Sequence, residues 1–117
     1  MTELTEPAQN QRSQDRVSTR RPAEIILNDQ VFQALIINLS LEGVAILTAT
    51  DLEIGDKIKI HFSLPGYEQS STLILNGEVT HHTQVNQQHM FGVRFALLSL
   101  HEKLVITGFI NFHHRLD

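Results

Sequence analysis

Two short motifs contain the residues best suited to bind a ligand. The first is Arg16-x-x-x-Arg20, and the second, further along the chain, is Asn38-x-Ser40-x-x-Gly43. Guanidinium groups pair well with phosphate oxygens and with the O6/N7 edge of guanine, because both present two neighbouring acceptors. The second motif adds a short amide, a hydroxyl and a glycine, which are typical of a tight turn. Together the two motifs predict a pocket for a small anionic guanine nucleotide.

The charge distribution favours a compact anion over a polyanion. The chain has 117 residues, enough for one domain, and a formal net charge of -4. Residues 12–21 contain four arginines and one aspartate, so a positive segment precedes an acidic remainder. Proteins that bind long nucleic acids normally present a broad basic surface. We therefore expect no nucleic-acid polymer as a partner.

Composition also argues against several other classes of function. Without cysteine the chain can form neither a disulfide nor a thiolate metal site. The adjacent histidines His81 and His82 would point to opposite faces of a strand, so we expect no metal site there. No activated nucleophile or carboxylate pair stands out, which predicts that the protein is not an enzyme. The start has no apolar signal segment and no run reaches membrane-spanning length, so we expect a cytoplasmic protein without membrane contact.

The elements that must position the motifs are predicted to be short strands. Apolar runs with turn residues between them occupy residues 23–27, 31–37, 44–48, 57–64, 72–85 and 91–95. Residues 57–64 alternate strictly between apolar and polar, as a half-buried strand does. Gly77 lies inside a long run and predicts a bulge or a bend. Regular strands without intervening helices favour an antiparallel barrel.

The two ends of the chain differ from this pattern. Ser99 and Glu102 fit a capping box, which predicts a C-terminal helix closing one mouth of the barrel. Residues 1–13 are too polar to bury much surface, so we expect them to form a flexible tail. The domain would then comprise residues 14–117. Pro22 favours an extended Arg21, so we expect the arginines on a mobile lead-in to a first strand beginning at Ala23.

In sequence the chain resembles the PilZ domain family over about residues 14–112. The likeness rests on Arg16-Val17-Ser18-Thr19-Arg20, on Asn38-Leu39-Ser40-Leu41-Glu42-Gly43, and on the later segments Gly77-Glu78-Val79 and Gly92-Val93-Arg94-Phe95. The resemblance implies an all-β, six-stranded antiparallel barrel with a C-terminal α-helix and a flexible N-terminal tail. It also implies a receptor for cyclic di-GMP that needs no other cofactor.

The resemblance assigns roles to particular residues. Arg16 and Arg20 would grip a phosphate and the guanine edges. Arg12 and Arg16 share the spacing, but the family places its second arginine where the chain enters the first strand, and Arg20 fits that place. Asn38, Ser40 and Gly43 would face the ligand. Gly43 would allow either a positive φ or a close approach of the ligand to the backbone. Arg21 and Arg94 are further candidates for ligand contact. Asp15 departs from the family pattern, because it places an acid beside the phosphate site.

The favoured interpretation is a receptor whose N-terminal tail changes conformation on binding and signals to an unidentified protein partner. Regulation of motility or of biofilm formation is the process that the family suggests. The main alternative is a PilZ-like adaptor that works by protein contact alone and binds no nucleotide. A small barrel for single-stranded nucleic acid is a weaker rival, because most of the phenylalanines fall at core-like positions.

Overall fold

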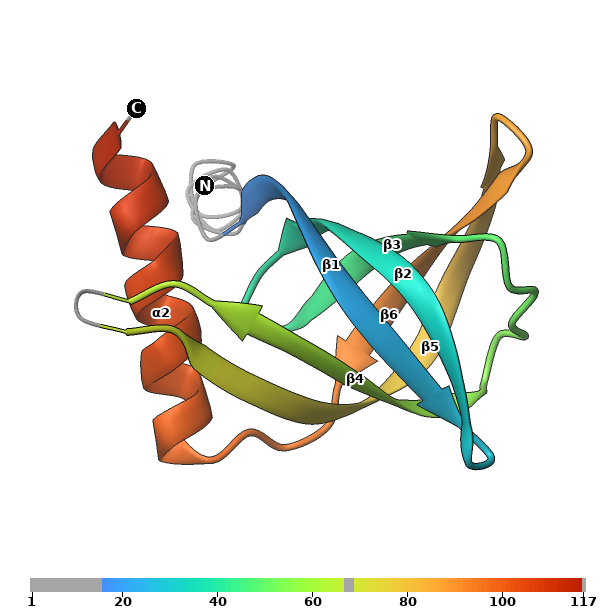
Figure 1. The fold of residues 1–117 in the computed structure, drawn as a ribbon, viewed down its shortest axis with the longest axis horizontal. Helices are drawn as coiled ribbons and strands as arrows, with labels where there is room; N and C mark the ends of the chain where they lie inside the picture. Colours follow the sequence, from blue (N-terminus) through green and yellow to red (C-terminus); the bar gives the residue numbers. More distant parts are fainter. Residues whose placement is uncertain (1–15, 67–68, 117) are drawn as a thin grey trace, which may run out of the picture.

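The computed structural model describes residues 16–66 and 69–116. In chain order the elements are β1 (Val17–Leu27), β2 (Gln30–Leu39), β3 (Gly43–Thr48), β4 (Lys57–Leu64), β5 (Ser71–Val85), β6 (Gln88–Phe95) and α2 (Leu100–Leu116). The six strands form a closed antiparallel barrel in the order β1-β2-β3-β6-β5-β4 (Figure 1). The predicted barrel with a C-terminal helix is confirmed, while the predicted tail, residues 1–13, lies outside the described residues.

The core follows from the alternation of apolar and polar residues. In β4 the side chains of Ile58, Ile60, Phe62 and Leu64 are buried, and those between them are exposed or half-buried. The other strands contribute in the same way, and the largest fully buried side chains include Phe91, Ile25, Ile36, Leu39 and Ile46. Pairing of β1 with β4 closes the ring, from Glu24↔His61 to Ile26↔Lys59. Closure leaves few unpaired strand edges, which stabilises a small barrel against aggregation.

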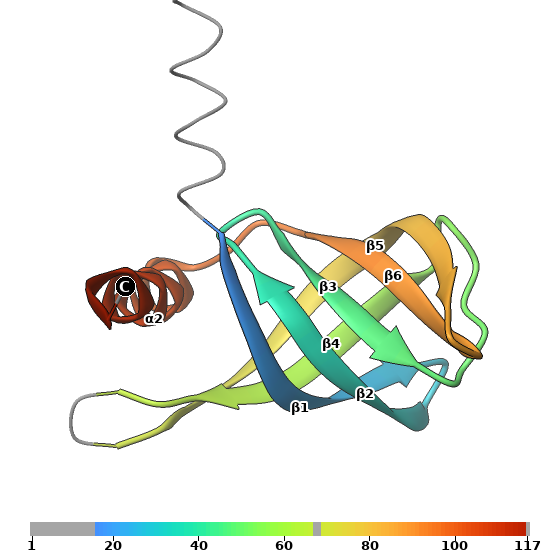
Figure 2. The ribbon, with the colours of Figure 1, turned by 90° about the horizontal axis from the view of Figure 1, so that it is seen from above.

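The helix begins at the predicted capping box. The Glu102 backbone N–H donates to Ser99 Oγ at 3.1 Å, and the Ser99 backbone N–H donates to Glu102 Oε1 at 2.8 Å. Helix α2 lies across one end of the barrel (Figures 1 and 2), where Ile106, Phe109 and Ile110 are buried. The helix therefore covers one end of the core, as expected. Within the described residues no helix is long and apolar enough to cross a membrane.

Strand β1 begins earlier than predicted. It starts at Val17, whose buried side chain pairs in register with Leu39 of β2, instead of at Ala23. Pro22 does not interrupt the strand, because the pairing of β1 with β4 begins only at Glu24 and leaves the edge at Pro22 free. The prediction that Arg20 and Arg21 lie on a mobile lead-in is thus wrong: both belong to an ordered strand.

Gly77 is required for close packing and does not mark the bulge. The register of β5 against β6 is regular at Gly77 and shifts between Val79 and His81. A Cβ atom at Gly77 would lie 2.6 Å from Val93 Cγ1 and 3.0 Å from the Arg94 carbonyl oxygen. Glycine at this position therefore lets β5 approach β6 closely where the barrel wall curves.

Candidate functional site

The turn between β2 and β3 is held together by Ser40. Its hydroxyl accepts hydrogen bonds from the backbone N–H groups of Glu42 (3.1 Å) and Gly43 (3.2 Å). The Ser40 backbone N–H donates to the Gly43 carbonyl oxygen at 2.9 Å. The side chain is only 6% exposed, so it stabilises the turn and does not line the neighbouring cavity. A serine hydroxyl here could bond either a phosphate of the ligand or the turn backbone, and in this conformation it bonds the turn backbone.

Gly43 is needed because β3 and β6 lie close together. It pairs with Arg94, and a Cβ atom in its place would lie 2.0 Å from the Val93 carbonyl oxygen. Its φ is not positive, so the suggested left-handed conformation is wrong. The close approach that glycine permits in this structure is that of β3 to β6, and the expected approach of a ligand to this backbone stays a prediction. Any larger residue must push the two strands apart.

Arg16 and Asn38 meet beside this turn. Pairing of Ser18 with Asn38 brings the start of β1 next to the end of β2. Arg16 Nη1 lies 3.5 Å from Asn38 Oδ1, the outer limit of a hydrogen bond. Both side chains line a cavity of about 350 Å³, whose other lining residues include Glu42, Gly43, Thr80, His81, Gly92 and Arg94. This volume is within the range of roughly 300–1,000 Å³ typical of small-molecule sites.

Three β-bulges surround this cavity. Register shifts occur between Ser18 and Arg21 in β1, between Ile36 and Asn38 in β2, and between Val79 and His81 in β5. A bulge inserts one extra residue, bends the strand and redirects the neighbouring side chain, and bulges concentrate next to functional sites. Here they fall beside residues that line the cavity. The bulges thus provide structural evidence for a binding site, independent of the arginine motif.

The cavity combines exposed charges with bare backbone. Arg16 and Arg94 are exposed cations at its edge, and Glu42 is an exposed carboxylate. Gly43 and Gly92 expose backbone, and a Cβ atom at Gly92 would lie 3.2 Å from His81 Cβ. Cationic donors next to an open backbone surface suit a flat ligand that carries phosphate.

Sequence reasoning missed several lining residues, among them Glu42, Thr80, His81 and Gly92. Glu42 lies inside the recognised turn motif, at a position to which that motif assigns no role. Thr80 and His81 reach the cavity only because of the bulge in β5, which no residue type signals. The sequence analysis considered His81 only as a possible metal ligand and predicted no metal site there. Gly92 was noted only for its likeness to a family strand.

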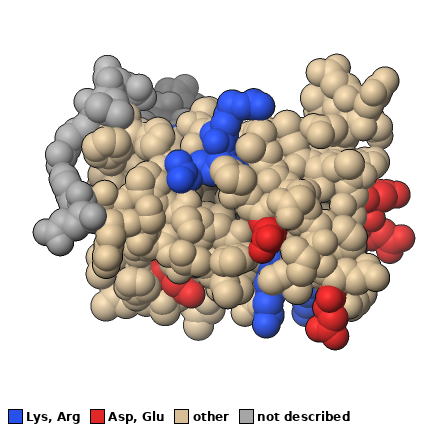
Figure 3. All heavy atoms as spheres, viewed as in Figure 1, with Lys and Arg blue, Asp and Glu red and all other residues tan. Residues whose placement is uncertain are grey.

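The remaining predicted arginines lie elsewhere. Arg20 is exposed on β1 but is not among the described residues that line the cavity. Arg21 donates from Nε to the Ser63 carbonyl oxygen at 3.0 Å and lies 6.0 Å from the centre of the Phe109 ring in α2. Figure 3 shows Lys and Arg side chains beside the start of β1, on a face that is otherwise mostly uncharged. The structure thus gathers Arg16, Asn38, Gly43 and Arg94 and places Arg21 against the helix.

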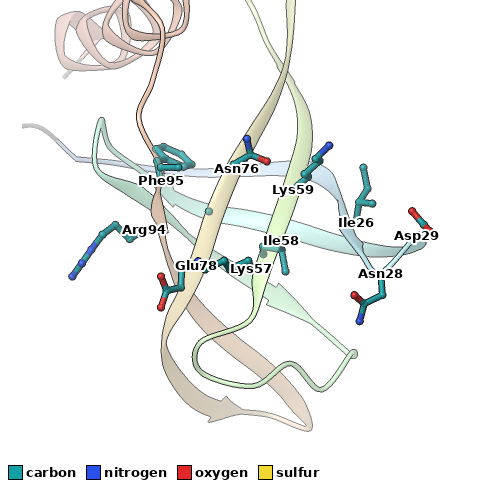
Figure 4. Close-up of a pocket in the computed structure, with 12 residues that line it drawn as sticks. Ile26, Asn28, Asp29, Lys57, Ile58, Lys59, Asn76, Glu78, Arg94 and Phe95 are labelled. Atoms are coloured by element: carbon teal, nitrogen blue, oxygen red, sulfur yellow. The ribbon is translucent and has the colours of Figure 1, made fainter.

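A second, larger cavity of about 470 Å³ shares Arg94 with the first. It contains two lysines, Lys57 and Lys59, together with Asn28, Asp29, Asn76 and Glu78. Figure 4 shows that Lys59 and Arg94 point in different directions, away from each other, so the cationic groups do not converge on one ligand position. Glu78 pairs in register with both Lys57 and Arg94, which reduces the positive field further. We therefore regard the cavity beside Arg16 and Asn38 as the candidate site.

Comparison with known proteins identifies relatives by sequence pattern and by fold. The family model described as the PilZ domain matches residues 10–112. No curated protein sequence matches the chain.

Three solved structures share its fold. The inhibitor of motility MotI/DgrA from Bacillus subtilis superposes with a TM-score of 0.80 at 12% identity, over 87% of this chain and 50% of that one. The PilZ domain of CeSA from a cellulose-synthesizing bacterium gives a TM-score of 0.59 at 17% identity, over 85% and 97%. A pathogenic protein from Xanthomonas campestris, a tetrameric PilZ domain, gives 0.56 at 18% identity, over 74% and 46%. The chain thus spans about half the length of the motility inhibitor, and at these identities the likeness concerns the fold alone.

Proposed function

The chain belongs to the PilZ domain family, and from this premise we propose that it is a cyclic di-GMP receptor that signals to a protein partner. Members of the family generally act as receptors for this nucleotide. The observation that supports the proposal most is the meeting of Arg16 and Asn38, 3.5 Å apart, at a cavity that also contains Arg94. The three residues come from three different parts of the chain. If the motifs were only a solvated tail and an ordinary turn, their polar side chains would not be expected to meet at one cavity.

The polar side chains at and beside the cavity would contact different parts of the ligand. Cyclic di-GMP carries two phosphates and two guanines, so it needs cationic donors and groups that read a base edge. Arg16 and Arg94 would donate to phosphate oxygens or to the O6/N7 edge of guanine. The Asn38 amide oxygen would accept from guanine N–H groups, and its current bond to Arg16 is long enough to be exchanged at little cost. Arg20, exposed on β1, would meet the part of the ligand that extends beyond the cavity.

We propose that the signal passes along β1 to α2. Arg16 borders the cavity, and in the same strand region Arg21 contacts the Ser63 carbonyl oxygen and the Phe109 ring. A ligand that draws the start of β1 toward the cavity would also change how Arg21 packs against the helix. Since residues 16–21 are already ordered, any ordering on binding would concern the residues before Arg16, which the structure does not describe.

The outer face of α2 is suited to a protein partner. Leu100, Leu104 and Phe112 are 73%, 63% and 48% exposed, and their spacing places them on one side of the helix. Beside them lies an apolar cavity of about 230 Å³, which includes Pro65, Gly66 and Phe109 among its lining residues. Exposed apolar patches of this kind mark interaction surfaces. We propose a cytoplasmic partner that controls motility or biofilm formation, with no part for membrane or nucleic-acid polymer.

The same helix face favours one alternative. An adaptor that binds its partner through α2 would need no nucleotide at all, and the exposed leucines would serve it equally well. In either case we propose a binding protein and not an enzyme.

Calorimetry with cyclic di-GMP tests the proposal directly. We expect binding with a dissociation constant of about 1 μM or lower, equivalent to about -8 kcal/mol or stronger. GTP should bind far more weakly, because it lacks the second guanine and the cyclic backbone. Backbone NMR of the same sample should place the shifted signals at Asn38, Gly43, His81 and Arg94. If neither heat nor shifts appear at millimolar ligand, the adaptor without nucleotide is the correct description.

A further inference from the structure

A pair of histidines lies on the hairpin formed by β5 and β6. His82 on β5 pairs in register with Phe91, and His89 on β6 pairs with Gln84, so the two histidines are diagonal neighbours. His82 Nε2 and His89 Nδ1 are 2.9 Å apart. His82 is exposed and His89 is half-buried. The two nitrogens face each other across neighbouring strands, and imidazole nitrogens are common ligands of metal ions in proteins. We propose that His82 and His89 form a binding site for a divalent transition-metal ion of tetragonal geometry, Cu(II) or Ni(II).

The separation of the nitrogens indicates the geometry of the ion. Metal–imidazole bonds are about 2.0–2.1 Å long. Two such bonds at 90° place the nitrogens about 2.9 Å apart, whereas a tetrahedral angle requires about 3.3–3.4 Å. The observed 2.9 Å matches the separation of nitrogens at adjacent positions of a square-planar or tetragonal ion. The ring centroids are 5.0 Å apart and the rings face each other, so both must rotate to direct their lone pairs at the ion. Cu(II) and Ni(II) prefer this geometry, whereas Zn(II) prefers the tetrahedral one.

The two rings are held in place by their surroundings. His82 stacks on the buried Phe91 with ring centres 4.8 Å apart and planes at 19°, and His89 lies 5.7 Å from the same ring at 29°. The hairpin turns at Asn86 and Gln87, whose φ values of 49° and 70° are those of a tight two-residue turn. A short turn and a shared aromatic support reduce the entropy that metal binding would cost.

Metal binding also requires a change of tautomer. In the hydrogen-bonded pair one facing nitrogen carries a proton and the other accepts it. Coordination needs a lone pair on both, so the donor ring must move its proton to its other nitrogen, and no proton is lost overall. Within residues 16–66 and 69–116 no group of three or more His, Cys, Asp or Glu could hold a metal, so water would fill the other positions. Such a two-ligand site binds reversibly.

This site differs from the one considered in the sequence. The absence of a metal site was predicted from His81 and His82, which indeed cannot share an ion: His81 lines the candidate nucleotide cavity, and His82 stacks on Phe91. The relevant pair joins two strands and is visible only in the folded barrel. Because the two sites involve opposite faces of β5, metal binding and nucleotide binding should be independent.

Titration with copper sulfate in a non-coordinating buffer tests the proposal. The wild-type protein should bind one Cu(II) with micromolar affinity, and the electron paramagnetic resonance spectrum should show nitrogen ligands. His82→Ala and His89→Ala should each weaken binding more than about tenfold, because each removes half of the protein donors. His81→Ala is the matched control on the same strand and should leave the affinity unchanged. Zn(II) should bind the wild type more weakly than Cu(II).

A measurement on the unmodified protein guards against variants that fail to fold. Substoichiometric Cu(II) should broaden the amide NMR signals of residues 80–91 first. Broadening centred on His101, His113 or His114 instead, or variants at His82 and His89 that fold and bind Cu(II) like the wild type, would overturn the proposal.

Discussion

Replacing Arg16 with alanine should weaken the binding of cyclic di-GMP without destabilising the barrel. The side chain is exposed, and the hydrogen bond described for it is the 3.5 Å contact with Asn38, so unfolding free energy should change by less than about 0.5 kcal/mol. A hydrogen bond to a charged group contributes about 1.5–3 kcal/mol. Since 1.4 kcal/mol corresponds to tenfold in affinity, and solvent screens an exposed pair, we expect a loss of about tenfold or slightly more.

Lys59→Ala is the matched control for this variant. Lys59 is also exposed, and its replacement removes the same single charge, but Lys59 lines the other cavity. A general loss of positive field would affect both variants alike and would shrink as salt is raised, because the Debye length falls to about 8 Å at 0.15 M. Calorimetry at two salt concentrations, with urea denaturation of each variant, separates the two effects. Equal losses for Arg16→Ala and Lys59→Ala, or a larger loss for Lys59→Ala, would refute our assignment of the site.

Three further variants test the other motif residues. Gly43→Ala should lower unfolding free energy by at least about 1–3 kcal/mol, since its Cβ would lie 2.0 Å from a carbonyl oxygen; urea denaturation measures this, and unchanged stability would show that the strands can separate freely. Ser40→Ala should leave two turn N–H groups without an acceptor and cost about 1–3 kcal/mol, so a loss of nucleotide affinity at full stability would instead indicate direct ligand contact. Arg21→Ala should leave affinity nearly intact but speed amide exchange in α2, because it removes a contact with Phe109; slower or equal exchange would contradict the proposed route of the signal.

The fold could be predicted from the sequence because its main determinants are local. Alternation in residues 57–64 identifies β4, and the Ser99–Glu102 pair identifies the start of α2. The start of β1 could not be predicted in the same way. Only pairing with Leu39 makes Val17 a core residue, and the segment around it is polar and contains Pro22. A strand supported mainly by its neighbour leaves little signal in its own residues.

The candidate site was predicted less completely, and the bulges explain why. The side-chain period of a strand is two, so one inserted residue moves every later side chain to the other face. Three such insertions occur around the cavity, and each changes which residues face it. Spacing in the sequence can therefore identify Arg16 and Asn38 as a motif, but it cannot show that His81 joins them while Ser40 turns inward.

The bulges also bear on how the site could transmit a signal. A regular ladder resists sliding, because a one-residue slip would expose the buried face. A bulge is a point where the ladder is already interrupted, so the strand can shift there with little loss of pairing. The bulge in β1 lies between Ser18 and Arg21. On one side of it Arg16 bonds to Asn38 at the cavity, and on the other side Arg21 lies over the Phe109 ring. A ligand that pulls on Arg16 would therefore act on the most deformable part of β1. The displacement would pass to Arg21, where regular pairing with β2 begins, and from Arg21 to α2.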